Sequence, residues 1–174
     1  MADSDGSSLG RIVVVGVVVA ILGGLGFLLV EPHLTSDKAA CDAPFAEQID
    51  PRSSQHLLPD APEPPYLTNP PTSGAHKPGL HSTGVLEDSV ERPVQVSLLE
   101  EGEALIQYRG LKGAARRDLQ SLAGAHNHIT VAPNATLDRP IVATAWLLKM
   151  NCSRVDATAL RDFARQHRLE VPRV

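Results

Sequence analysis

The feature that most constrains this chain is an uncharged apolar run of nineteen residues, 12–30, between Arg11 and Glu31. As a helix rising about 1.5 Å per residue, the run would be roughly 28 Å long, close to the ~30 Å hydrocarbon core of a bilayer. Every face of this helix would be apolar, and its valines and glycines are poor helix formers in water. The run therefore predicts a transmembrane helix and not the core helix of a soluble domain.

The same run favours a retained anchor over a cleaved signal peptide. The apolar part of a signal peptide is usually about 7–15 residues long and ends close to small residues. This run is longer, and the small residues Ala39 and Ala40 come only well beyond its end. Lys38 also stands where a lipoprotein signal would have an aliphatic residue before Cys41.

The basic residues around the run give it a direction. Arg11 directly precedes the run, and the nearest basic residue after it is Lys38. Under the positive-inside rule, the amino terminus is then cytoplasmic and the rest of the chain is outside. We therefore predict a single-pass cell-membrane protein with a cytoplasmic segment 1–11, a signal anchor 12–30 and an extracytoplasmic remainder.

Small residues recur at four-residue intervals within the run, at Gly16, Ala20 and Gly24. Such residues line one stripe of a helix, where the backbone of another helix can approach closely. Two interpretations remain open. The stripe can contact a membrane protein partner or a second copy of this chain, or the small residues can simply be scattered through a generic anchor.

Prolines are concentrated after the anchor, with nine of the fourteen in residues 31–71. Proline interrupts helices and central strands, so this part cannot form a long regular element. We predict a proline-rich tether over 31–64 that holds a domain off the membrane. Residues 65–174 are then one domain, long enough to bury its own core.

Hydrophobic periodicity predicts the elements of that domain. Alternation of Val94, Val96 and Leu98 with polar residues is typical of a half-buried strand. Asp156 is placed to cap the last helix. The full set of predictions is strands at 94–98, 104–108, 127–132 and 141–148, and helices at 111–122 and 157–167. This order predicts an α+β fold, with two helices on one face of a four-stranded, mostly antiparallel sheet.

Residues 70–76 read Pro-Pro-Thr-Ser-Gly-Ala-His, Tyr66 precedes them, and residues 143–146 read Ala-Thr-Ala-Trp. In these blocks and the terminal helix, the chain resembles domain of unknown function 3105, a mostly bacterial family of membrane-anchored proteins. The resemblance covers about residues 65–172. It implies a membrane anchor and a strand followed by a short terminal helix, but it brings no assigned activity.

The chain departs from the family in one block, which in relatives typically reads His-x-Leu-Glu-His-Gly. Leu99, Glu100 and Gly102 match this block. Ser97 and Glu101 stand where the family has histidines. If those histidines serve a metal or catalytic site in relatives, the resemblance implies that the site is lost or rebuilt here.

The chain has seven histidines, and neutral imidazoles are common ligands of zinc and copper. His76 and His81 lie in a loop rich in glycine and proline, and His126 and His128 lie on one face of a predicted strand. The four could converge on one copper or zinc ion. The alternative is that they are loop histidines that form hydrogen bonds or face water. For His76 this would be a structural latch tied to the backbone.

No catalytic motif is present, so the sequence predicts that the protein is not an enzyme. Glu100, Glu101 and Glu103 form an acidic cluster, but an exposed turn is its expected setting, and paired carboxylates need shifted pKa values for acid–base work. The sequence also lacks the Gly-x-Ser-x-Gly elbow of serine hydrolases. A net charge of −4 and 3% aromatic residues disfavour nucleic acid binding.

Cys41 and Cys152 are the only cysteines, and both would lie in an oxidising compartment. A disulfide between them would close a loop of about 110 residues and contribute about 4–5 kcal/mol in the chain-entropy model. The sequence leaves open whether they pair, because it does not give the distance between them.

Two functions follow from these features. The first is a membrane-anchored binding module, an accessory subunit of a membrane protein assembly, which contacts the bilayer and a protein partner or a second copy. The alternative is an extracytoplasmic domain that handles copper or zinc.

Overall fold

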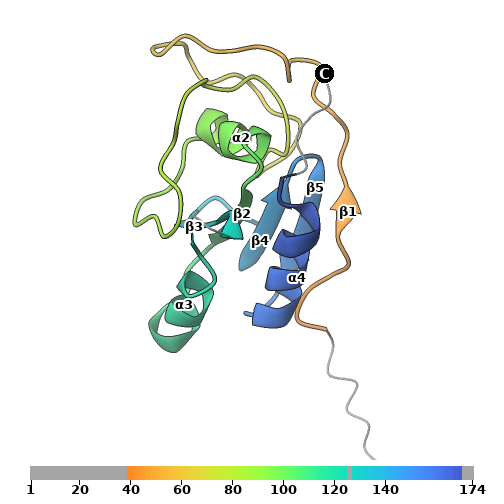
Figure 1. Cartoon of the computed structure of the whole chain (residues 1–174), viewed down its shortest axis with the longest axis vertical. Coiled ribbons are helices and arrows are strands. Elements are labelled where there is room, and N and C mark those ends of the chain that lie inside the picture. Colours follow the sequence, from red (N-terminus) through yellow and green to blue (C-terminus); the bar gives the residue numbers. More distant parts are fainter. Residues whose placement is uncertain (1–38, 125–126, 170–174) are drawn as a thin grey trace, which may run out of the picture. The chain divides into compact units, whose positions relative to one another are not determined.

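The computed structural model describes residues 39–124 and 127–169 (Figure 1). The predicted anchor lies outside these residues, as does its stripe of small residues, Gly16, Ala20 and Gly24. In the described ranges, no helix has the length and apolar character needed to cross a membrane.

The described residues form an α+β domain with a five-stranded mixed sheet and three helices. The strands are β1 (Phe45–Ala46), β2 (Ala104–Tyr108), β3 (Ile129–Pro133), β4 (Ile141–Ala145) and β5 (Leu148–Cys152). The helices are α2 (Arg92–Glu100), α3 (Gly113–Gln120) and α4 (Ala157–His167). The strand order is β1-β5-β4-β2-β3, in which β2 and β3 run parallel and the other neighbours run antiparallel. Parallel strands need a crossover, and α3 lies in the segment that connects β2 to β3.

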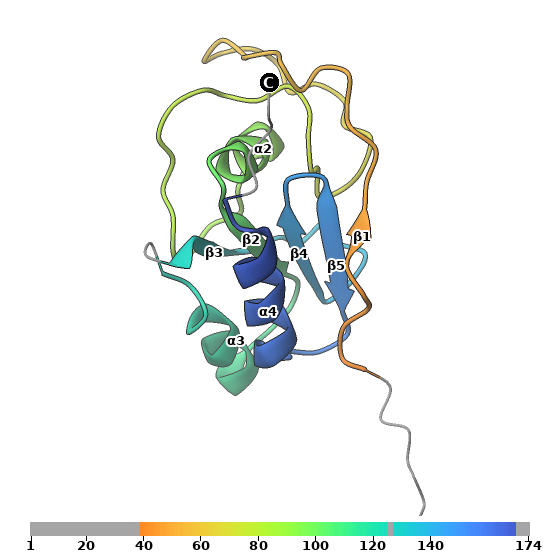
Figure 2. The same ribbon diagram turned by 45° about the vertical axis from the view of Figure 1, so that its right-hand side comes forward.

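The helices cover both faces of the sheet (Figure 2). Ala104 and Ile106 of β2 share a buried cluster with Leu119 of α3 and Phe163 of α4. Leu105 points the other way and packs with α2 in a second cluster. The sequence predicts two helices on one face of four strands, so the fifth strand and the third helix, which covers the opposite face, are corrections.

The largest correction concerns residues 94–98, which belong to helix α2 and not to a strand. Pro93 lies in the first turn, where its fixed φ favours a helix. Gly102 ends the helix in a Schellman motif with φ of +86°, in which the N–H of Glu103 donates to Leu98 O at 2.9 Å. Start and stop signals therefore outweigh the alternating pattern. The helix buries both Ser97 and Leu98, which are neighbours in the sequence. The alternation of apolar and polar residues therefore does not correspond to one buried and one exposed face.

The carboxyl-terminal part follows its local signals more closely. Asp156 caps α4 as predicted, with its side chain accepting the N–H of Ala159 at 3.0 Å. The strand predicted at 141–148 is instead two strands, because the chain turns at Trp146 and Leu147. Leu147 has a φ of +58°, which a sequence pattern does not reveal. The resulting strand β5 pairs with β4 and β1.

Cys41 and Cys152 form a disulfide across a sequence separation of 111 residues. Backbone hydrogen bonds flank it, from Asp42 N to Asn151 O and from Ser153 N to Ala40 O, both 2.8 Å. The bond thus ties the first described residues to β5. Residues 39–64, assigned from the sequence to the tether, lie within the same compact unit as the sheet.

Opening this disulfide should lower stability strongly, because it closes most of the described chain into one loop. We expect the double variant Cys41→Ser, Cys152→Ser to lose about 4–5 kcal/mol of unfolding free energy. Urea unfolding followed by circular dichroism measures this loss. The reduced wild type should match the variant, and an unchanged urea midpoint in both would contradict the pairing.

Candidate metal centre

His76 lies at the end of the Pro-Pro-Thr-Ser-Gly-Ala-His block and is fully buried. Its backbone forms a parallel bridge with His56. His76 N donates to Gln55 O at 3.1 Å, and Leu57 N donates to His76 O at 2.7 Å. Two imidazoles twenty residues apart are therefore held together by main-chain hydrogen bonds.

The rest of the block is fixed by contacts to distant segments. Ser73 Oγ accepts the N–H of Asp50 at 2.9 Å, and Thr72 O accepts the N–H of Leu147 at 3.2 Å. The Tyr66 hydroxyl donates to Ala75 O at 2.6 Å. Burial raises the pKa of Tyr66, so the phenol stays protonated and keeps this donor. The loop that carries His76 is thus tied at several points.

Gly74 allows this close packing. Its φ is +130°, and a Cβ atom there would lie 3.0 Å from the ring of Tyr66. Only glycine fits such a backbone against an aromatic ring without displacing it. The glycine and the aromatic residue of the family block are therefore packing partners.

The hydrogen bond of His76 Nδ1 sets the tautomer of the ring. Nδ1 lies 3.0 Å from Gly74 O, and because a carbonyl oxygen can only accept, Nδ1 must carry a hydrogen. In the neutral ring the lone pair is then on Nε2. This is the arrangement found in most metal-binding histidines, where a backbone carbonyl orients the imidazole through its other nitrogen.

His76 Nε2 faces Glu100 at the carboxyl end of α2. The distance from Nε2 to Oε2 is 2.6 Å, yet the geometry is not that of a hydrogen bond, and this buried nitrogen has no other partner among the residues described. A lone pair and a carboxylate repel each other at such a distance. The contact therefore needs a cation, either a proton on Nε2 or a metal ion, to be stable.

His56 completes a cluster of three potential ligands. Its ring stacks edge-on against that of His76, with centroids 4.9 Å apart and planes at 73°. One nitrogen of each imidazole and one oxygen of Glu100 all lie within 4.8 Å of one another. His56 is exposed, Glu100 half-buried and His76 buried, so the cluster opens to solvent on one side.

Of the four histidines predicted as metal ligands, only His76 belongs to this cluster among the residues described. His76 lies in the cluster, whereas Nε2 of His81 is 3.0 Å from Lys77 O and Nδ1 of His128 is 3.2 Å from Glu103 Oε1. Within 39–124 and 127–169, neither of these two belongs to a group of three potential ligands. His126 lies outside the described residues.

Sequence reasoning missed His56 and Glu100 as partners of His76. Glu100 was the one acidic residue that matched the family block, and this match was the available signal. His56 lies within the predicted tether, 31–64, and belongs to no motif. Its position depends on a long-range bridge that local patterns do not encode.

Ser97 and Glu101 lie beside the loop that follows His76. The Ser97 hydroxyl donates to Lys77 O at 2.5 Å. Burial raises the pKa of the Glu101 carboxyl, the charges of Glu103 and Glu100 raise it further, and His81 opposes them. The same loop also borders a hollow of about 340 Å³ lined by Leu57, Pro59, Lys77, Pro78 and His81.

The profile of a family described as "Protein of unknown function (DUF3105)" matches residues 62–173. The chain belongs to this family. No curated protein and no solved structure matches the chain. The matched region of this family member contains His76 and Glu100, whereas His56 and Cys41 precede it.

Substitution of Gly74 tests the packing of the loop. We expect Gly74→Ala to lower the unfolding free energy by about 1–3 kcal/mol through backbone strain, and by more through the clash with Tyr66. Gly79→Ala is the matched control, because Gly79 has a similar φ of +122° and no atom within 4 Å of its added Cβ. Thermal unfolding compares the two. Equal losses would show that the Tyr66 contact is unimportant.

Proposed function

We propose that this protein is a membrane-tethered extracytoplasmic domain that binds zinc or copper through His56, His76 and Glu100. The observation that carries the proposal is the buried Nε2 of His76, which has a fixed tautomer and no hydrogen bond among the described residues. The Cys41–Cys152 disulfide supports the outward location, because such bonds persist in oxidising compartments.

The cluster suits an ion that prefers nitrogen and oxygen ligands. Imidazole and carboxylate bind zinc and copper, and the disulfide occupies both cysteines, so no thiolate competes. Two ligand atoms on one tetrahedral zinc are about 3.3 Å apart, given bonds of about 2.0 Å. The 2.6 Å between His76 Nε2 and Glu100 Oε2 is shorter than this. One of the two side chains must therefore move away from the other when the ion binds. Glu100 lies at a helix end with its side chain 36% exposed, and it is the freer of the two.

Three protein ligands leave a fourth position of a tetrahedral ion for water or an exchanging ligand. Structural zinc sites are usually closed by four protein ligands, whereas open sites retain an exchangeable position. The exposed side of the cluster gives such a ligand access. The site therefore fits metal handling better than a purely structural role.

Metal content of the full-length protein tests this proposal. After loading with zinc or copper in a mild detergent and desalting, we expect about one bound equivalent per chain. His56→Ala and Glu100→Gln should each reduce this strongly, because each removes one of three ligands. His128→Ala is the matched control and should retain the metal. Both residues changed in the first two variants have solvent access, so the folded state should survive.

Two results would contradict the proposal. One is metal content in the wild type below about 0.1 equivalent with either metal, which excludes a tight site. The other is equal loss in His128→Ala and His56→Ala, which would move the site elsewhere. Circular dichroism of each variant separates metal loss from unfolding.

An accessory role in a membrane protein assembly is the second candidate, and exposed leucines favour it. Leu58 and Leu80 are 77% and 99% exposed and are chain neighbours of residues that line the hollow near Lys77 and His81. Burying each against a partner would contribute about 1.5–3 kcal/mol. We propose a membrane protein as this partner, docked on the same side as the hollow.

Co-purification tests the assembly role. The full-length chain extracted in mild detergent should carry a membrane protein partner, and Leu58→Ser, Leu80→Ser should release it, because the variant removes the apolar contact area. Leu67→Ser, at a leucine that is 54% exposed, is the control. Isolation of the wild type as a lone monomer in several mild detergents would contradict the role, and self-association would identify a second copy instead.

A further inference from the structure

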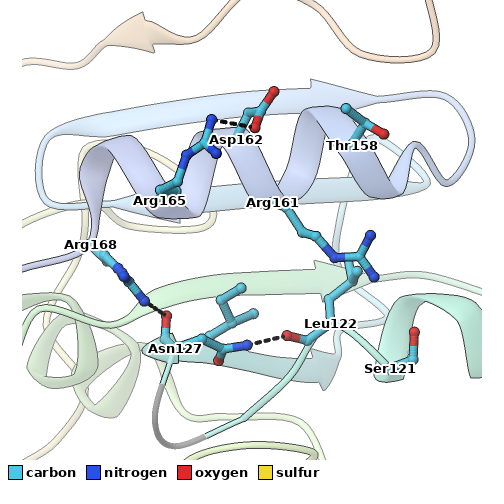
Figure 3. A pocket seen from close by; sticks show the side chains of 9 residues that line it. Ser121, Leu122, Asn127, Thr158, Arg161, Asp162, Arg165 and Arg168 are labelled. Atoms are coloured by element: carbon cyan, nitrogen blue, oxygen red, sulfur yellow. Dashed lines mark hydrogen bonds and ion pairs between the residues drawn. The ribbon is translucent and has the colours of Figure 1, made fainter.

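Helix α4 and the segment between α3 and β3 enclose an open groove of about 430 Å³ (Figure 3). Arg161, Arg165 and Arg168 line it from α4 and its carboxyl end. The groove shares no lining residue with the cluster around His76. It is therefore a separate feature of the surface.

The charge of the groove is opposite to that of the chain. Its lining contains three arginines and one acidic residue, Asp162, which leaves two positive charges in excess. The whole chain has a net charge of −4. Local positive charge in an acidic protein indicates a site for anions.

The arginines keep hydrogen-bond donors free for a ligand. Arg165 is paired with Asp162 at 2.8 Å, and Arg168 Nη1 donates to Asn127 O at 2.9 Å. Each guanidinium has five N–H donors, so these contacts leave several unused. Arg161 has no hydrogen bond or ion pair within the described part of the chain. Figure 3 shows its side chain extending from α4 toward Leu122 on the opposite wall.

We propose that this groove binds a phosphoryl group, with Arg161 as its principal ligand. A guanidinium fork matches two phosphate oxygens, and the excess of two positive charges balances a phosphate dianion better than a single carboxylate. Thr158 adds a hydroxyl on the same wall, while Leu122 and Ile129 provide apolar surface. The groove exceeds the size of inorganic phosphate, so the preferred ligand is a phosphomonoester with an organic group.

Titration calorimetry of the full-length protein in a neutral detergent, at constant ionic strength, tests the proposal. The titrants are inorganic phosphate, glycerol phosphate and a short-chain phosphatidic acid kept below its micellar concentration. Arg161→Gln should weaken binding at least about tenfold, because charge-assisted hydrogen bonds are lost. Arg139→Gln removes the same charge from an exposed position outside the groove and should bind like the wild type.

The titrants distinguish the source of the phosphoryl group. If the binding of glycerol phosphate depends on Arg161, the ligand is a soluble phosphate ester. If only the binding of the phosphatidic acid depends on Arg161, the ligand is a lipid headgroup. The proposal is overturned if no titrant shows binding that depends on Arg161, or if Arg139→Gln weakens binding equally. The Glu100→Gln variant should bind phosphate normally, which separates this site from the metal centre.

Discussion

The loop that ends at His76 depends on one constraint, which is that its buried polar groups need partners. Buried backbone groups without hydrogen bonds are costly, so a buried irregular loop folds only where other segments supply donors and acceptors. Here two separate segments do so, one through Asp50 and Gln55 and the other through Leu147. The same hydrogen bonds that stabilise the loop bring His56 beside His76. Structure and candidate site therefore have a common origin.

The hydrogen bonds of the loop also mean that His76 should move less than Glu100. His76 is held by its own backbone and by Gly74, whereas Glu100 ends a helix and is partly exposed. A fixed imidazole beside a movable carboxylate can hold a proton or a metal ion without refolding of the domain.

Local signals predicted some of the fold well. The cap at Asp156 and the apolar spacing after it identified α4. Strand β2 was predicted with its observed bounds, but as the hairpin partner of a strand at 94–98 that is instead part of helix α2. Residues 94–98 show the limit of periodicity, since a helix with several buried sides matches a two-residue alternation by chance. Strand β5 was missed because its start depends on the backbone angle of Leu147. Of the site, His76 was predictable from its motif, but His56 and Glu100 are joined to it by long-range pairing.

X-ray absorption at the zinc edge tests the central claim most directly, because it counts the ligands on the ion itself. Loaded with one equivalent of zinc, the full-length protein should show two imidazole nitrogens and carboxylate or water oxygens at about 2.0–2.1 Å. His56→Ala should lose one imidazole from the outer-shell scattering. Coordination by oxygen alone in the wild type, or an imidazole signal unchanged by His56→Ala, would contradict the account.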